Sequence, residues 1–529
     1  MPLCFDDPNP KRVLRLDGST GTMLQQRGMP AGASPEQYCL DRPEVIGGIQ
    51  EAYLDAGADV LYTPTFGANR IKLAEYGLAD RTAEINRRLA GQTVATARAR
   101  GRAVGGDVGP TGLFFTPFGE RSFDEGLAIY TEQIRALAEA GVDFIVLETQ
   151  LDIQEARIGL LAARACCDLP VVVSMTFDEH GRTLTGTDPV SALNIIQSLG
   201  ASAFGVNCST GPEAMLTVAR ELAPFRRVPL WVKPNAGLPE IRAGRSVFPM
   251  DPESFAGFAA AFVAAGASAL GGCCGTTPAH IRALARALSE APLAVPAAGD
   301  RSLLLSSARR TVMVAPGNRS PLRIIGERIN PTGKPALQDA LRAGDLGRVK
   351  ELAAEQQAQG ADLLDVNVGL PGADERRLML DAVAALALQV EAPLVIDSSR
   401  PEVIEAALRL YPGRALVNSL SGEKDKLERL TPILAAYGAA FIVLPLDDEG
   451  IPETLERRRE VLDRVLAACR RHGLAPDRMV VDGLAMTVSA NPDHAAVSLA
   501  TLRHAAETLG TPTVLGLSNI SFGLPRREV

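Results

Sequence analysis

Short runs of Val, Ile and Leu recur along the chain, and each is followed by a longer stretch rich in Ala, Leu, Arg and Glu. Eight such runs precede residue 290, at 13–19, 60–66, 103–109, 144–149, 171–177, 203–208, 230–236 and 269–274. Because they lack strict alternation of apolar and polar residues, they predict the buried strands of a parallel sheet. Eight strand–helix units of this size predict a TIM barrel, and a doubly wound open sheet is the alternative.

Seven further apolar runs follow, at 322–327, 363–367, 394–398, 415–420, 441–446, 479–484 and 513–519. The stretches "DAGADVLY", "EAGVDFIV" and "QGADLLDV" place a glycine between a helix and a strand, which is typical of a helix C-terminus. We therefore predict an α/β chain of two TIM (β/α)8-type barrels in tandem. The second lacks its last units, so we expect it to be open between its first and seventh strands. We also expect the native polypeptide to continue with a helix, an eighth strand and a corrinoid domain.

Residues 291–321 interrupt this rhythm with a high density of Pro, Gly, Ser and Arg. Such a composition predicts a linker, with one small hairpin inside it. The sequence thus predicts three parts. They are a first barrel at 1–290, the linker at 291–321, and a second, incomplete barrel at 322–529.

Composition narrows the choice of partners. The 529 residues carry a formal net charge of −8 and only 5% aromatic residues, which argues against binding to nucleic acid or to an anionic membrane surface. The amino terminus resembles neither a signal nor a transit peptide, and no apolar run reaches the ~18 residues of a membrane span. Eight cysteines are too few for a disulfide scaffold, so we expect a cytoplasmic protein.

Three of the cysteines fall where barrel enzymes carry their chemistry, at the carboxyl ends of strands. Cys208 ends the sixth predicted strand, and Cys273 and Cys274 end the eighth. In a closed barrel only one strand separates the sixth strand from the eighth, so the three thiols would lie close together. Three thiolates with an open fourth position would match a catalytic zinc site. Packing as small apolar residues is the alternative. For the other cysteines we expect packing alone: Cys4, Cys39, Cys166, Cys167 and Cys469.

Motifs in the first half resemble a known family. The stretches "LDGSTGTMLQQRG" (16–28), "LYTPTFGAN" (61–69), "GVNCS" (205–209) and "GGCCGTTPAHI" (271–281) resemble zinc-dependent homocysteine S-methyltransferases. The resemblance implies that Cys208, Cys273 and Cys274 bind Zn²⁺ and that homocysteine sulfur takes the fourth position. It also implies that Asp17 and Glu148 bind the substrate ammonium, and that backbone N–H groups at Gly18 and Ser19 bind its carboxylate.

The second half presents acids and amides at its strand ends, and these groups suit the donor-and-acceptor edge of a pterin. The set is Glu327, Asn330, Asp365, Asn367, Asp397, Asn418, Asp482 and Asn519. The stretches "IIGERINPTGK" (324–334), "IDSS" (396–399), "VNSLSGE" (417–423) and "GLSNISFGLP" (516–525) resemble the pterin-binding barrel of methyltetrahydrofolate methyltransferases. That resemblance implies that Asp397, Asn418 and Asp482 lie at the pterin ring and Asn519 near the methyl-bearing nitrogen.

The two barrels in this order resemble the N-terminal half of cobalamin-dependent methionine synthases. The resemblance implies methionine formation from homocysteine and 5-methyltetrahydrofolate, with the methyl group carried by cobalamin on a separate domain or protein. The nearest candidate for a cobalamin-ligand motif, "DEHGRT" (178–183), lies inside the first barrel and lacks the expected second glycine. Two other functions remain open. One is a cobalamin-independent thiol methyltransferase that uses the first barrel only, and the other is a non-catalytic partner of a corrinoid protein.

Overall fold

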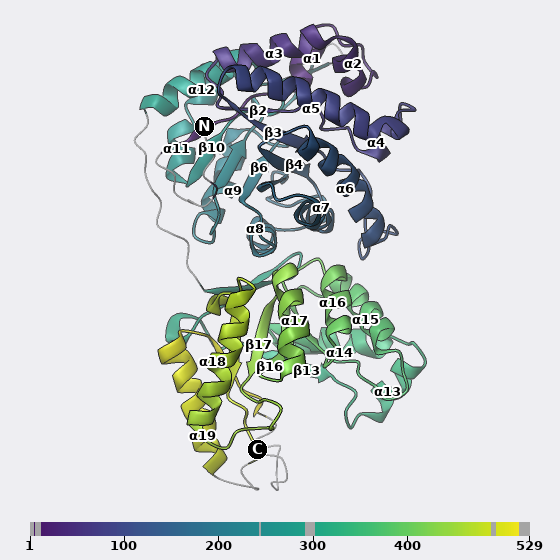
Figure 1. The fold of residues 1–529 in the computed structure, drawn as a ribbon, viewed down its shortest axis with the longest axis vertical. Helices are drawn as coiled ribbons and strands as arrows, with labels where there is room; N and C mark the ends of the chain where they lie inside the picture. Colours follow the sequence, from purple (N-terminus) through teal and green to yellow (C-terminus); the bar gives the residue numbers. More distant parts are fainter. Residues whose placement is uncertain (1–4, 6–11, 243–244, 291–301, 488–492, 518–529) are drawn as a thin grey trace. The chain divides into compact units, whose positions relative to one another are not determined.

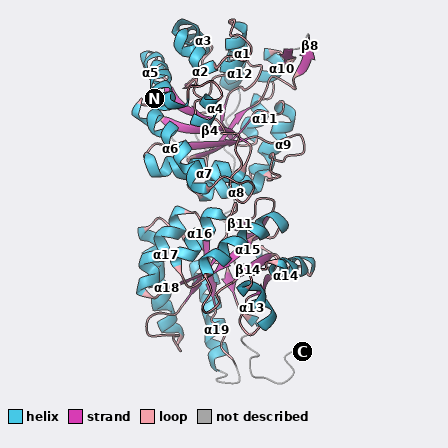
Figure 2. Cartoon of the chain, turned by 90° about the vertical axis from the view of Figure 1, so that its right-hand side faces the viewer, coloured by secondary structure: helices cyan, strands magenta, loops and turns pink. Residues whose placement is uncertain are grey.

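The computed structural model describes residues 5, 12–242, 245–290, 302–487 and 493–517 (Figure 1). The chain divides into two compact units, Met1–Asp300 and Arg301–Val529. In both units helices surround a parallel sheet (Figure 2). None of the described helices combines the length and apolar character that crossing a membrane requires.

An eight-stranded parallel sheet forms the centre of the first unit. Its strands are β1 (Leu14–Arg15), β2 (Val60–Tyr62), β3 (Ala103–Val108), β4 (Phe144–Gln150), β5 (Val171–Met175), β6 (Ala203–Asn207), β7 (Leu230–Lys233) and β10 (Ala267–Leu270). The order β1-β10-β7-β6-β5-β4-β3-β2 is that of a barrel, and a parallel bridge between Leu16 and Val60 brings its two ends together. The predicted TIM-type barrel is confirmed, and the open-sheet alternative is not observed.

Helices alternate with these strands around the barrel (Figure 1). They are α1 (Thr20–Gln26), α2 (Pro35–Asp41), α3 (Pro43–Asp55), α4 (Arg70–Ala74), α5 (Thr82–Ala99), α6 (Phe123–Glu139), α7 (Ile153–Cys166), α8 (Pro189–Ser198), α9 (Pro212–Leu222), α10 (Pro252–Ala256), α11 (Ala259–Ala264) and α12 (Pro278–Glu290). A small hairpin, β8 (Glu240–Arg242) with β9 (Arg245–Val247), follows β7. Gly57 and Gly141 end α3 and α6 with φ of 101° and 85°, a left-handed conformation that favours glycine.

Side chains fill the interior of the first barrel. Leu16, Val60, Val146 and Phe144 are buried there beside Trp231. The Phe144 and Trp231 rings meet edge to face with centroids 5.3 Å apart. This packing closes the barrel below the strand ends, so the polar residues at the carboxyl rim lie on an apolar floor.

The second unit holds a seven-stranded parallel sheet whose strands follow one another in sequence order. They are β13 (Ile325–Ile329), β14 (Leu363–Val366), β15 (Leu394–Asp397), β16 (Leu416–Ser421), β17 (Ala440–Leu444), β18 (Met479–Asp482) and β19 (Thr513–Val514). Within the described part of the chain β13 and β19 are the two edges, so the predicted seven-stranded, incomplete barrel is confirmed. Its helices are α13 (Pro335–Arg342), α14 (Gly347–Ala358), α15 (Glu375–Gln389), α16 (Pro401–Leu410), α17 (Lys424–Ala436), α18 (Leu455–Arg471) and α19 (Asp493–His504).

An antiparallel hairpin, β11 (Leu303–Ser306) with β12 (Thr311–Val314), falls within the segment predicted as a linker. Its buried Leu303 and Val312 pack with Leu363 and Val395, which lie near the amino ends of barrel strands. The Arg414 guanidinium also donates a 3.0 Å hydrogen bond to the carbonyl of residue 304. The hairpin therefore packs as part of the second unit, and the division between the units falls before it.

Candidate functional site

Three thiols meet at the carboxyl rim of the first barrel. Cys208 follows β6, Cys273 and Cys274 follow β10, and β7 lies between these two strands. The three Sγ atoms all lie within 4.8 Å of one another, and those of Cys208 and Cys274 are 3.8 Å apart. The spacing and the donor set fit a soft divalent metal such as zinc.

The backbone around these thiols is held by neighbouring strand ends. Cys208 adopts a left-handed φ of 62°, which is uncommon outside glycine. The N–H of Cys274 donates to Asn235 Oδ1 at 3.0 Å, and the N–H of Cys273 donates to the Pro234 carbonyl at 2.8 Å. Residues that follow β7 thus hold the backbone of the two cysteines that follow β10.

Electrostatics favours negative charge on this thiol cluster. Hydrogen bonds from Cys273 and Cys274 lower the pKa of Cys208 to about 3. The hydrogen bond with Cys208 raises the pKa of Cys273 and is the largest cause of the raised pKa of Cys274. Neighbouring thiols therefore stabilise a first thiolate and oppose a second, and a bound cation would relieve that opposition.

A buried ion-pair cluster occupies the same rim. Lys233, at the end of β7, places Nζ 2.9 Å from Glu148 Oε1 and 3.3 Å from Asp17 Oδ1. The Asp17 carboxylate also accepts a 2.7 Å hydrogen bond from the backbone N–H of Tyr62. Burial raises the pKa of Asp17 and raises that of Glu148 to about 7. Burial lowers the pKa of Lys233, but Glu148 and Asp17 raise it more, so the lysine remains an ammonium.

Asp107, at the end of β3, adds a third carboxyl group to this cluster. It is 5% exposed, and its Oδ1 has no hydrogen-bond partner among the described residues. Burial and the nearby Glu148 raise its pKa well above the usual value. Asp107 and Lys233 were not among the predicted site residues, although both lie within apolar runs predicted as strands, at 103–109 and 230–236.

The two remaining residues predicted to bind substrate are engaged within the structure. A side chain at Gly18 would collide with the Tyr53 ring and with Thr276, so only glycine fits there. Ser19 caps α1 by accepting from the Thr22 N–H, and its own N–H donates to Thr276 Oγ1 at 3.1 Å. Thr276 is a further rim residue that sequence analysis did not identify.

The second barrel brings together acids and amides from three successive strands. Asn418 Nδ2 donates to Asp365 Oδ2 at 3.2 Å, and Asn367 Nδ2 donates to Asp397 Oδ2 at 3.0 Å. Asp365 is 2% exposed, and its Oδ1 has no hydrogen-bond partner in the described part of the chain. Burial and the nearby Asp397 raise the pKa of Asp365 to about 8, which favours the neutral form of this carboxyl group.

The other predicted pterin-site residues lie apart from these hydrogen bonds or outside the described structure. Asn330 donates to Glu327 Oε1 at 3.3 Å in the segment after β13. Asp482, at the end of β18, accepts a 2.7 Å hydrogen bond from the N–H of Leu484, and burial raises its pKa. Asn519 lies outside the described residues.

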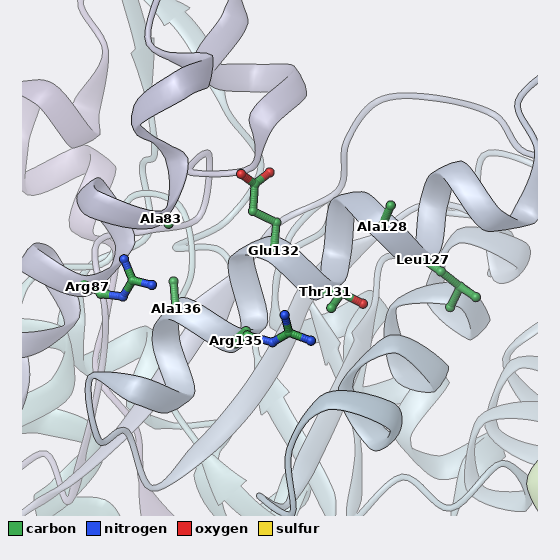
Figure 3. A pocket seen from close by; sticks show the side chains of 8 residues that line it. All are labelled: Ala83, Arg87, Leu127, Ala128, Thr131, Glu132, Arg135 and Ala136. Carbon is green, nitrogen blue, oxygen red and sulfur yellow. The ribbon is translucent and has the colours of Figure 1, made fainter.

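A cavity of about 590 Å³ lies elsewhere, beside helices α5 and α6 (Figure 3). It is lined by Ala83, Arg87, Leu127, Ala128, Thr131, Glu132, Arg135 and Ala136. Neither the three thiols nor the acids that surround Lys233 line it.

The fold and rims define a class: paired α/β barrels, one with a three-thiol rim and one with a rim of acids and amides. Residues 14–288 match the family model of homocysteine S-methyltransferases, and residues 326–528 match that of pterin-binding enzymes. The chain belongs to the homocysteine S-methyltransferase family.

Similar proteins include two methionine synthases. That of Mycobacterium leprae is 31% identical over 550 residues, and that of Mycobacterium tuberculosis is 30% identical over 566 residues. Each match covers 97% of this chain and 45% of the relative, so the chain spans about half the length of these relatives and matches an N-terminal half. The metallated form of the Escherichia coli homocysteine methyltransferase MmuM is 25% identical, with a TM-score of 0.44, covering 53% of this chain and 100% of that one.

Proposed function

We propose that the chain makes methionine by methylating homocysteine, with 5-methyltetrahydrofolate as the methyl donor. The observation that carries the proposal is the group of three thiol sulfurs within 4.8 Å at one barrel rim. Methionine synthases that match 97% of the chain support it. The match to pterin-binding enzymes supports folate as the donor.

In this proposal Cys208, Cys273 and Cys274 hold a zinc ion and leave a position open to the substrate sulfur. Zinc, when bound, would supply the Lewis acidity that favours the thiolate form of homocysteine at neutral pH. Asp17 and Glu148 bind the ammonium group and so fix the distance from the amino acid end to the reacting sulfur. The buried floor excludes water and strengthens these charge interactions.

In the second barrel we assign pterin binding to the predicted acids and amides. Asp397, Asn418 and Asp482 would pair with the pterin ring, because carboxylates and amides complement its N–H donors and acceptors. A neutral Asp365 can donate a hydrogen bond as well as accept one, which suits a pterin carbonyl or ring nitrogen. We place Asn519 near the methyl-bearing nitrogen.

A corrinoid held by a separate domain or protein is the partner that this division of labour needs, because each barrel binds one substrate. The "DEHG" stretch forms a turn in which Asp178 accepts from the N–H groups of His180 and Arg182. The His180 side chain itself is 79% exposed.

Zinc content tests the first barrel. Cys208→Ala should lose tightly bound zinc and homocysteine binding and retain methyltetrahydrofolate binding, as measured by metal analysis and calorimetry. Cys167→Ala, at the end of α7, is the control and should keep its zinc. Full zinc occupancy in Cys208→Ala would refute the site.

The second barrel is tested by the separation of two half-reactions. Asp482→Ala should impair demethylation of methyltetrahydrofolate by added cobalamin and spare homocysteine methylation from methylcobalamin. Asp381→Ala, on the exposed surface of α15, is the control for both rates. Equal loss of both activities in Asp482→Ala would contradict the two-site proposal. Thiol methylation without any dependence on corrinoid would favour the first-barrel-only alternative.

A further inference from the structure

Lys233 lies at the centre of the buried charges of the first barrel. It is 6% exposed, and its ammonium contacts Asp17 and Glu148 and lies 3.8 Å from the centroid of the Tyr62 ring. Apolar packing of similar volume would stabilise a barrel as well as a buried ion pair does. A lysine held in this way at a catalytic rim therefore calls for a functional explanation.

The charge balance of the rim indicates what such a lysine does. Asp17, Asp107 and Glu148 present three carboxyl groups, which attract an ammonium and repel a carboxylate in a medium of low polarity. Two of the eight strands end in a basic residue, Arg15 of β1 and Lys233 of β7. Arg15 pairs with Asp59 at 2.8 Å, whereas Lys233 contacts Asp17 and Glu148. An amino acid carries both charges, so its carboxylate needs a cation at this rim.

One of the two backbone N–H groups expected to bind the substrate carboxylate already has a partner in the structure. The Ser19 N–H, which the family resemblance assigns to the substrate carboxylate, donates to Thr276 Oγ1 at 3.1 Å. That hydroxyl in turn donates to the Cys273 carbonyl at 2.7 Å. Redirecting the Ser19 N–H to a substrate would break a contact of the loop that carries the thiols.

We propose that Lys233 is a specificity-determining residue that binds the carboxylate of the thiol substrate, so that the first barrel selects zwitterionic amino-acid thiols. The inference rests on the proposed function and adds a residue to it. In this arrangement the Lys233 ammonium contacts the carboxylate of the substrate on one side. On the other side it contacts Asp17 and Glu148, the acids that bind the ammonium of the same substrate. A thiol without a carboxylate cannot make this contact with Lys233 and therefore binds more weakly.

The test is calorimetric binding of three thiols to the zinc-loaded full chain. They are L-homocysteine, 4-mercaptobutyrate, which lacks the amine, and 3-aminopropane-1-thiol, which lacks the carboxylate. Lys233→Met should weaken the first two by about tenfold to hundredfold, as expected for a charged hydrogen bond, and leave the third unchanged or tighter. Lys72→Met, which removes an exposed lysine of α4, is the control and should change none of them.

Other outcomes overturn the proposal. Equal weakening of all three thiols would make Lys233 a structural residue, and no weakening would remove it from the site. If Lys233→Met does not fold, Lys233→Gln is judged by the same criteria. The unaltered chain must also bind homocysteine at least about tenfold more tightly than 3-aminopropane-1-thiol, and equal binding would refute the proposal without any variant. Failure of the unaltered chain to bind zinc or homocysteine would instead contradict the proposed function.

Discussion

Glu155→Gln is expected to stabilise the first unit at alkaline pH and to leave its stability unchanged in mild acid. Glu155 lies on α7 and is 2% exposed. Its Oε1 accepts hydrogen bonds from the Thr111 N–H at 2.7 Å and from the Tyr130 hydroxyl at 3.1 Å. Burial raises the pKa of this carboxyl group from 4.5 to about 7, although the contacts with Thr111 oppose the change.

The magnitude follows from that change in pKa. Because the folded pKa is raised, the stabilising contribution of the neutral acid is complete below about pH 4.5 and is lost as the pH rises through about 7. At 1.36 kcal/mol per pKa unit, the ionised carboxylate costs the folded unit about 3 kcal/mol. Glutamine keeps the acceptor oxygen and carries no charge, so it avoids this cost.

Tryptophan fluorescence makes the measurement specific to one unit. Trp231 is the only tryptophan of the chain and is 3% exposed inside the first barrel. Urea unfolding of both proteins at about pH 5 and about pH 8.5 would give the free-energy difference at each pH. Glu139→Gln, an exposed glutamate of α6, is the matched control. The reasoning is refuted if Glu155→Gln changes stability by the same amount at both pH values.

Two further substitutions, one in each unit, test contacts seen in the structure. Gly272→Ala would press a methyl group against Thr276, so we expect weaker zinc binding in a chelator competition, whereas Gly91→Ala faces open space and should not change it. Unchanged zinc affinity in Gly272→Ala would contradict the first expectation. Arg458→Met removes a buried guanidinium that donates to the Gly483 carbonyl at 2.7 Å. Arg458→Met should therefore destabilise the second unit by about 3 kcal/mol. The second unit has no tryptophan, so its unfolding is followed by circular dichroism, and an unchanged unfolding transition would refute this expectation.

The succession of strands and helices along the chain was predictable because the sequence patterns that mark each element are local. Each buried strand is a short apolar run, and glycines such as Gly57 and Gly141 mark helix ends wherever a left-handed residue is needed. The open second sheet followed from the same count of runs. The hairpin at 303–314 was predicted as part of a linker, and its packing against the second barrel depends on distant residues such as Leu363 and Val395.

The sequence by itself determined that Cys208, Cys273 and Cys274 end strands of one barrel, and its family motifs suggested zinc. Only the tertiary structure decided that their sulfurs meet within 4.8 Å, and their role as zinc ligands stays a proposal. Lys233 shows the difference most clearly. In the sequence it is one lysine after an apolar run, but closure of the barrel brings it against acids from β1 and β4. Such a contact joins residues far apart in the chain, and no local pattern of hydrophobic and polar positions encodes it.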